Sequence, residues 1–228
     1  IHPTSLTSKN TLISSDNKGY AEYLLENQDH GVDRNVPGSG DGFVAAFANA
    51  NAGDVSPNTW LKPGQGPTSD QFKSVKMQGE KQANAVRSQL KSSGTPVGKG
   101  LDSRISYFNF SGMNVDAKYT GSGHNERTCQ GFLGTPFGAG STEDGGGGWA
   151  VYKEGSGRPS ILGTLVFTPS AAQTRCQQPK GILFSAKNGT IIQEKYPVQI
   201  MRFGDYYLLG MPGEFTGAVG VQYRQDAA

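Results

Sequence analysis

The chain has 228 residues, of which 35% are hydrophobic and 33 are glycine, and its formal net charge is +2. This length fits one large domain or two small ones. A charge so close to zero, without a dense basic patch, excludes a nucleic-acid-binding protein, and no apolar stretch is long enough to span a bilayer. Glycine at roughly twice its usual share favours a loop-rich fold that contains β-structure over a helical bundle.

The first part of the chain alternates loops with short ordered segments. Residues 11–26 predict a loop that enters a helix, with Asp16 or Asn17 as its cap. Residues 30–41 are rich in glycine, proline and aspartate, which predicts a loop. The apolar run at residues 43–48 predicts a buried strand.

The strongest helix signal spans residues 69–92. Ser69 or Asp70 can cap its N-terminus. Apolar residues recur at helical spacing, and charged residues occupy the other face. The apolar set predicted to face the core is Phe72, Val75, Met77, Ala83, Val86 and Leu90.

The second part of the chain predicts strands and glycine-rich loops. Residues 101–119 alternate between apolar and polar side chains, which predicts one or two strands. Residues 120–157, including the glycine run at 145–148, predict irregular structure. A hairpin turn is predicted at Gly204-Asp205. Further strands are predicted in three short apolar segments, residues 182–184, 198–203 and 206–211.

These elements contain neither a βαβ repeat nor a Gly-x-Gly-x-x-Gly motif. The predicted fold class is therefore mixed α/β (α+β), with layered β-sheets, a few helices and many loops.

The most informative segment of the sequence is FVAAFANANAGDVSPN, residues 43–58. Its apolar run ends in small residues and leads into a polar loop, in which Gly53 permits a tight turn and Pro57 fixes the chain just after Ser56. A buried segment that stops at a rigid polar loop is one way in which a scaffold presents a reactive group. From residue types alone, however, Asp-x-Ser-Pro-Asn is an ordinary turn composition.

Cysteine and histidine form no local metal motif. Cys129 and Cys176 lie far apart without a Cys-x-x-Cys partner, which excludes a cysteine zinc site and leaves either two buried thiols or one disulfide. The chain has three histidines, and none belongs to a His-Glu-x-x-His pattern. His2 lies next to the N-terminal residue, whereas His30 and His124 lie in polar loops and are expected to be solvated.

Six blocks of the sequence together resemble the neutral ceramidases, zinc-dependent amidases that cleave ceramide into sphingosine and a fatty acid. FVAAFA followed by GDVSPN resembles the signature segment of that family. The other blocks resemble further family segments in the same order: IHPTSL with SSDNKGYAEYLL, GQGPTSDQF, RTCQGFLGTPFGAGSTEDG, RCQQPKGILF and LGMPGEFT. The resemblance implies that residues 1–228 are part of a single catalytic domain, an internal segment without the family's N-terminal part and C-terminal immunoglobulin-like domain.

The resemblance assigns roles to individual residues. His2 and Glu214 match a histidine and a glutamate that bind Zn²⁺ in the family, and Ser56 matches a serine needed for activity. The family's other ligands, a histidine and a tyrosine, lie outside this segment, so the chain alone is expected to bind metal weakly and to need the remaining segments of the same enzyme. Ser56 is either a nucleophile or a positioning group, and we favour positioning because no histidine lies near it in sequence. Asp54 and Asn58 are expected to hold the loop.

The resemblance also implies a secreted or lumenal enzyme that acts on ceramide or a related N-acyl sphingolipid at a membrane or micelle surface. A Cys129–Cys176 disulfide is expected in such an oxidising compartment. Asn109 and Asn188 stand in triplets that fit N-glycosylation. Two rival hypotheses stay open: a non-catalytic truncated homologue that binds lipid, and a metal-independent serine hydrolase that uses Ser56.

Overall fold

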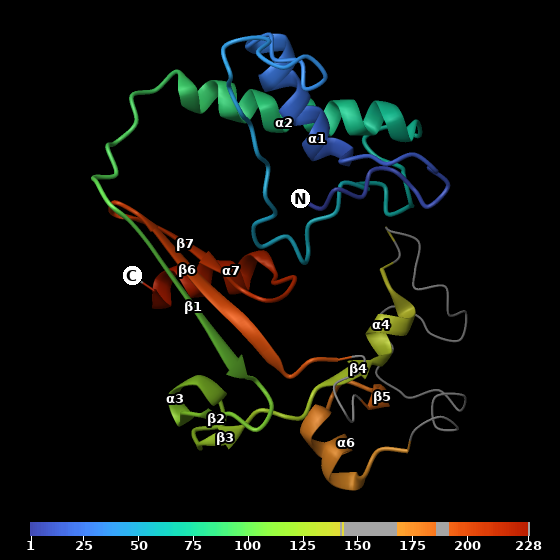
Figure 1. Cartoon of the computed structure of the whole chain (residues 1–228). Coiled ribbons are helices and arrows are strands. Elements are labelled where there is room, and N and C mark those ends of the chain that lie inside the picture. The colour runs from blue at the N-terminus through green and yellow to red at the C-terminus, as the bar shows by residue number, and fades with distance from the viewer. Residues whose placement is uncertain (142, 144–167, 186–191, 228) are drawn as a thin grey trace. The chain divides into compact units, whose positions relative to one another are not determined.

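The computed structural model describes residues 1–141, 143, 168–185 and 192–227 (Figure 1). They form a mixture of helices and small sheets, as predicted, and divide into two compact units. The first unit contains residues 1–95 and 214–227 with Glu143, and the second contains residues 96–141, 168–185 and 192–213. The glycine run at 145–148 and the glycosylation triplet at Asn188 lie outside the described residues.

The first unit is helical. Helix α1 (Asp16–Tyr23) continues directly into the π-helix η1 (Leu24–Asp29), and α2 (Gln71–Leu90) packs against α1 (Figure 1). Helix α7 (Gly217–Asp226) is capped by the side chain of Thr216. The core of the first unit consists of the buried residues Ala21, Leu24, Leu25, Ala45 and Ala83, with Tyr20, Phe43, Phe47 and Val86 packed against them.

Helix α2 confirms the strongest helix prediction, but its buried face differs from the predicted one. The Asp70 carboxylate caps the helix by accepting hydrogen bonds from the backbone N–H groups of Phe72 and Lys73, at 3.0 and 3.2 Å. Phe72 and Leu90, both predicted to face the core, are 53% and 63% exposed. Of the predicted set, Ala83 is buried and Val86 packs against the core. The other buried residues of the helix are Ser74, Gln78 and Gly79.

The reason for this difference is the close approach of α1 and α2. A Cβ atom at Gly79 would meet the backbone oxygen of Asn17 and the side chain of Tyr20, each at 2.8 Å. Only glycine fits at this position, and small or polar residues fill the remaining narrow contact. The large apolar side chains near the ends of α2 therefore stay outside it.

The predicted capping of α1 is wrong. The helix begins at Asp16, and the preceding Ser15 makes no side-chain cap hydrogen bond. Asp16 has φ 54, in the left-handed region, and its carboxylate accepts from the adjacent Asn17 N at 2.6 Å and from the backbone N–H groups of Ser5 and Leu6 at 3.2 and 2.8 Å. The side chain thus holds another segment of the chain, one that a local helix signal does not reveal.

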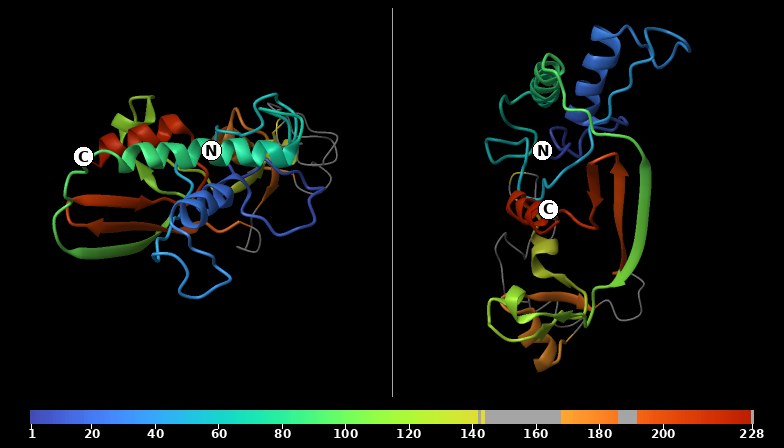
Figure 2. Two further views of the ribbon diagram at one scale, coloured as in Figure 1. Left: turned by 90° about the horizontal axis from the view of Figure 1, so that it is seen from above. Right: turned by 90° about the vertical axis from the view of Figure 1, so that its left-hand side faces the viewer.

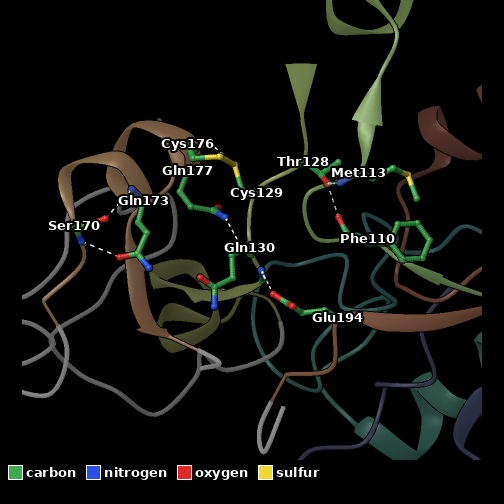
Figure 3. Close-up of a disulfide and its surroundings, with 11 residues drawn as sticks. Phe110, Met113, Thr128, Cys129, Gln130, Ser170, Gln173, Cys176, Gln177 and Glu194 are labelled. Atoms are coloured by element: carbon green, nitrogen blue, oxygen red, sulfur yellow. Dashed lines mark hydrogen bonds between the residues drawn. A yellow bond between two sulfur atoms is a disulfide. The ribbon is translucent and has the colours of Figure 1, made fainter. Parts of the chain in front are cut away.

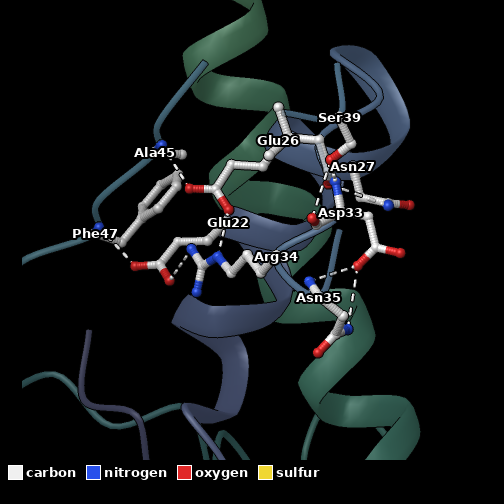
Figure 4. Close-up of polar contacts among 10 residues, drawn as sticks. Glu22, Glu26, Asn27, Asp33, Arg34, Asn35, Ser39, Ala45 and Phe47 are labelled. Carbon is white, nitrogen blue, oxygen red and sulfur yellow. Dashed lines mark hydrogen bonds and ion pairs between the residues drawn. The ribbon is translucent and has the colours of Figure 1, made fainter. Parts of the chain in front are cut away.

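The strand predicted at residues 43–48 is not assigned as a strand. Burial does alternate along it, with Ala45 buried and Phe47 half-buried between exposed neighbours. However, the backbone N–H groups of Ala45 and Phe47 donate to the carboxylates of Glu26 and Glu22, at 2.9 and 3.1 Å (Figure 4). Two carboxylates one helical turn apart therefore replace the neighbouring strand.

Arg34 connects these two carboxylates from the predicted loop at residues 30–41. Its Nε atom donates to Glu26 Oε2 at 2.6 Å, and its Nη2 atom donates to Glu22 Oε2 at 3.3 Å (Figure 4). The hydrogen bond from Arg34 holds the pKa of the buried Glu26 carboxyl below its usual range, against the opposing effect of desolvation. Glu26 therefore stays ionised while it binds the backbone.

The described residues of the second unit form three small antiparallel sheets. The largest has the order β1-β6-β7, formed by β1 (Leu101–Asn109), β6 (Lys195–Phe203) and β7 (Tyr206–Gly210), which lie side by side in Figure 2. Gly204, with φ 61, begins the predicted two-residue turn, and Phe203 lies opposite Tyr206. The strand predictions for this sheet are confirmed.

The remaining elements of this unit are short. β2 (Asn114–Val115) pairs with β3 (Glu126–Arg127), and β4 (Phe132–Gly134) pairs with β5 (Ile182–Ser185). Helix α3 (Ala117–Thr120) ends the region predicted as strand, and α4 (Thr135–Ala139) lies in the region predicted as irregular. Both predictions were too coarse, because elements of two to five residues contain too little periodicity to be recognised.

Helix α6 (Ala171–Gln177) was not predicted, although its N-terminus has a complete capping box. Ser170 Oγ accepts from Gln173 N, and Gln173 Oε1 accepts from Ser170 N (Figure 3). The expected Cys129–Cys176 disulfide is confirmed and attaches this helix to the segment before β4, with 5.8 Å between the Cα atoms (Figure 3).

Candidate functional site

Three of the sequence blocks meet within the first unit. The backbone N–H of His2 donates to the carbonyl of Val55 at 3.0 Å, which joins the HPTSL block to the GDVSPN loop. The N–H of Gly53 donates to the carbonyl of Phe215 at 2.9 Å, which joins the same loop to the PGEFT block. A Cβ atom at Gly53 would collide with the backbone oxygen of Glu214, so this approach requires glycine.

The two polar residues that flank Ser56 hold the loop, as predicted. Asp54 Oδ1 accepts a hydrogen bond from Gly217 N at 2.9 Å, at the start of α7. Asn58 is buried, and its Nδ2 atom donates to the carbonyl of Thr4 at 3.1 Å. The GDVSPN loop is therefore hydrogen-bonded to both of the blocks beside it.

The side chains of His2 and Glu214 face each other. His2 Nε2 lies 3.2 Å from Glu214 Oε1, and His2 Nδ1 lies 3.3 Å from the carbonyl oxygen of Val55. A carbonyl can only accept, so the contact at Nδ1 is a hydrogen bond only when Nδ1 carries a proton, which in a neutral ring leaves Nε2 without one. The lone pair of Nε2 then faces a carboxylate oxygen, and a proton or a cation between the two atoms is needed to make that arrangement favourable.

Ser56 follows Val55 directly and is partly buried. Its Oγ atom accepts a hydrogen bond from the backbone N–H of Asn58 at 3.1 Å. This short turn fixes the direction of the hydroxyl group relative to the loop. The loop places Ser56 immediately beside the residue whose carbonyl holds the His2 ring.

The comparisons with known proteins identify the family. The model of the N-terminal part of neutral/alkaline non-lysosomal ceramidases matches residues 1–228. The chain belongs to this family. Neutral ceramidase of Pseudomonas aeruginosa is 38% identical over 234 residues, 99% of this chain and 33% of the relative. Neutral ceramidase of Mycobacterium tuberculosis is 37% identical over 237 residues, 100% of this chain and 36% of the relative.

Solved structures of the ceramidase family share the fold. A structure described as ceramidase complexed with C2 matches with a TM-score of 0.75 and 35% identity, over 99% of this chain and 34% of its own. Neutral ceramidase from Pseudomonas aeruginosa matches with a TM-score of 0.66 and 30% identity, over 99% and 32%. The chain thus spans about a third of the length of the relatives it matches.

Sequence reasoning missed Asp16 and Asn17 in this ceramidase-family chain. One or the other was predicted to cap the helix, whereas the side chains of both bind the segment that carries His2. The signal was present in the SSDNKGYAEYLL block, which follows the HPTSL block closely in the sequence. Asp and Asn side chains readily bind backbone groups of nearby segments. The polar residues before the helix in this block are therefore candidates for contact with the HPTSL block.

The two other histidines are His30, in the first unit, and His124, in the second. His124 is exposed, as predicted. His30 is partly exposed; its ring stacks on Phe43 with 4.0 Å between centroids, and its Nδ1 atom lies 2.7 Å from Asp41 Oδ2. The hydrogen bond with His30 holds the pKa of the Asp41 carboxyl below its usual range.

Within the part of the chain that the structure describes, no group of three or more histidine, cysteine, aspartate or glutamate side chains could hold a metal ion. The described residues bring together two potential ligands, His2 and Glu214. None of the described helices is long and apolar enough to cross a membrane.

Proposed function

We propose that this chain is part of a zinc-dependent amidohydrolase that cleaves the N-acyl amide of ceramide, or of a related N-acyl sphingolipid, to sphingosine and a free fatty acid. Its relatives are named neutral ceramidases, and a similar solved structure is described as ceramidase complexed with C2. The observation that carries the proposal is the pair His2 Nε2 and Glu214 Oε1, 3.2 Å apart where three family blocks meet.

The chemistry of this pair suits a zinc ion. Imidazole nitrogen and carboxylate oxygen are both common zinc donors. The Val55 carbonyl at Nδ1 leaves Nε2 as the donor atom, and metal-bound histidines commonly make such a hydrogen bond with their other nitrogen. When bound, zinc would supply a water activated near neutral pH and polarise the amide carbonyl. The remaining ligands would come from further segments of the same enzyme.

The residues of this chain would hold the reacting groups in place. Ser56 orients the scissile amide or the attacking water through its hydroxyl group, whose direction is fixed by the hydrogen bond from Asn58 N. Both ring nitrogens of His2 are directed at other groups, Val55 O and Glu214 Oε1, so His2 is not aligned as a base for Ser56. This alignment favours positioning over a nucleophilic role and counts against the metal-independent serine hydrolase.

The Cys129–Cys176 disulfide supports a secreted or lumenal location, because structural disulfides persist in oxidising compartments. We place the substrate at a membrane or micelle surface, since ceramide is water-insoluble, and we regard residues 1–228 as part of one catalytic domain. Asn109, at the end of β1, is the glycosylation candidate within the described residues.

The test is Glu214→Gln in the native polypeptide that carries these residues, with Glu80→Gln on the exposed surface of α2 as the control. Zinc content is measured by atomic absorption, and hydrolysis with a fluorescent ceramide. We expect Glu214→Gln to lose its bound zinc and its activity to fall by more than about 100-fold. Even residues that only hydrogen-bond to a metal ligand change metal affinity or activity by about 10- to 100-fold when they are replaced. Full activity with full zinc content in Glu214→Gln would overturn the proposal.

The rival functions give different results in the same samples. Hydrolysis that survives a chelator, together with covalent labelling of Ser56, would indicate the serine hydrolase. Ceramide binding without any turnover, with or without added zinc, would indicate the non-catalytic lipid-binding homologue.

A further inference from the structure

Asn17, in the first turn of α1, is completely buried and uses both ends of its side-chain amide. Its Nδ2 atom donates to the carbonyl of His2 at 3.1 Å and to Ser5 Oγ at 3.0 Å. Its Oδ1 atom accepts from Gln82 Nε2, on α2, at 3.0 Å. The carbonyl of His2 can only accept, so the amide nitrogen must face it.

The neighbouring Asp16 holds the same N-terminal segment. Its carboxylate accepts from the N–H groups of Ser5 and Leu6, and its own backbone has φ 54. A non-glycine residue keeps this conformation where surrounding contacts determine it. Asp16 and Asn17 therefore fix residues 2–6 on α1, and the contact of Asn17 is with the backbone of His2 itself.

His2 is consequently held from two directions. Its backbone N–H donates to the carbonyl of Val55 at 3.0 Å, and its Nδ1 atom lies 3.3 Å from the same oxygen. Its carbonyl is held on the other side of the residue by Asn17. If the contact with Asn17 is lost, the His2 backbone can rotate about its contact with Val55. The ring then changes its position relative to Glu214.

We propose that Asn17 is a positioning residue for His2: it sets where the Nε2 atom lies and thereby the affinity of the site for its metal ion. The inference rests on the proposed function for the identity of that ion as zinc. Metal sites tolerate deviations of only about 0.2 Å in ligand distance, so a small shift of the His2 backbone weakens binding. The contact of Gln82 with Asn17 extends this support to α2.

The test variant is Asn17→Asp, which keeps the size of the side chain but replaces the donor group that faces the His2 carbonyl by a carboxylate oxygen. The dissociation constant of zinc is measured in the native polypeptide by competition with a chromophoric chelator. We expect binding to weaken about 10- to 100-fold, the usual effect of losing a group behind a metal ligand. Asn84→Asp, the same change at an exposed position of α2, is expected to leave it unchanged.

A second control separates positioning from a general loss of stability. Leu25 is buried in the core of the first unit, and Leu25→Ala removes packing without touching the His2 segment. With both variants folded by circular dichroism, zinc affinity should fall in Asn17→Asp and not in Leu25→Ala. Unchanged affinity in Asn17→Asp, or an equal loss in Leu25→Ala, would overturn the inference.

If Asn17→Asp does not fold, Gln82→Ala provides the milder variant. It leaves both donors of Asn17 in place but removes the group that holds its Oδ1 atom. A smaller loss of zinc affinity in the same direction is expected, and unchanged affinity in folded Gln82→Ala would count against the inference.

A measurement without metal distinguishes failure of this inference from failure of the proposed zinc site. The ¹⁵N chemical shifts of the His2 ring, recorded with chelator at about pH 8.5 where imidazole is ordinarily neutral, report its tautomer. Without metal we expect the single proton of the neutral ring to lie mainly on Nε2, facing the ionised Glu214 carboxylate, in the wild type. In Asn17→Asp we expect a mixture of tautomers, because a displaced ring loses that contact. Identical shifts in both proteins would overturn positioning by Asn17, whatever the outcome of the Glu214→Gln test of the proposed zinc site.

Discussion

The two compact units differ in the kind of hydrogen bond that stabilises each of them internally. In the first unit, side chains on α1 and η1 bind the backbone of segments that have no strand partner, as Glu26 does for Ala45 and Asn17 does for His2. In the second unit, the 9-residue strand β1 pairs with β6 along its whole length, and all of its residues are exposed.

The difference matters because backbone ladders use groups that every residue except proline possesses. Side-chain contacts with the backbone depend on one functional group at one position. Substitutions should therefore be tolerated along β1 and poorly tolerated on α1 and η1. The candidate site lies in the first unit, where individual side chains determine the geometry.

The largest expected effect is in the second unit, where the Cys129–Cys176 disulfide closes a loop with a sequence separation of 47. Replacing both cysteines by alanine should lower the free energy of unfolding by about 4 kcal/mol, by the chain-entropy estimate for a loop of that length. Hydrogen exchange read by mass spectrometry should show weaker protection in the second unit and unchanged protection of α1 and α2. An equal loss of protection in both units would show that the two units are not stabilised independently.

The next effect is at Glu26, whose buried carboxylate binds Ala45 N and Arg34. Glu26→Leu leaves a backbone N–H without its acceptor, which should lower the free energy of unfolding by about 2 kcal/mol, measured by urea denaturation. Glu80→Leu, at an exposed position of α2, should change it by less than about 0.5 kcal/mol. Similar values for the two variants would show that the side-chain contacts are not what holds this unit.

Lowering the pH should destabilise the first unit before the second. The loss in free energy of unfolding should be smaller than that caused by Glu26→Leu. Hydrogen bonds from Arg34 and from Arg87 lower the pKa values of Glu26 and Asp29 respectively. Because these pKa values lie lower in the folded state than in the unfolded state, the stabilisation is complete above about pH 4.3, near the unfolded pKa of glutamate, and is lost as pH falls through the folded values.

Urea denaturation at a series of pH values measures this loss. In Glu26→Gln the amide oxygen still accepts from Ala45 N but does not titrate, so the slope of stability against pH in this range should become shallower. An unchanged slope in Glu26→Gln would assign the acid sensitivity to other groups.

The smallest effect is expected on the sheet. Leu101, the first residue of β1, is 81% exposed, and it pairs with Phe203 through backbone groups. Leu101→Thr should therefore change the free energy of unfolding by less than about 0.5 kcal/mol. A loss above about 1 kcal/mol in urea denaturation would mean that this face of the sheet is covered in solution.

Elements with a long periodic signal were predictable from the sequence. Helix α2 and the β6–β7 hairpin follow from local spacing and from the turn residue Gly204, whose φ of 61 suits glycine. For the site, the family blocks indicated His2, Ser56 and Glu214 as candidates, and the disulfide was expected for the same reason. The contacts of the Asp54 and Asn58 side chains agree with the loop-holding role expected for them.

The sequence by itself thus determined helix α2 and the β6–β7 hairpin, because long periodic segments and tight turns depend on neighbours a few residues away. Only the tertiary structure decided that Phe43–Ala48 binds Glu22 and Glu26 in place of a strand, and that Asn17 is not a cap but a donor to His2. It also decided that His2 and Glu214, 212 residues apart, face each other. These contacts join residues whose proximity depends on the packing of whole helices, and local patterns contain no information about that packing.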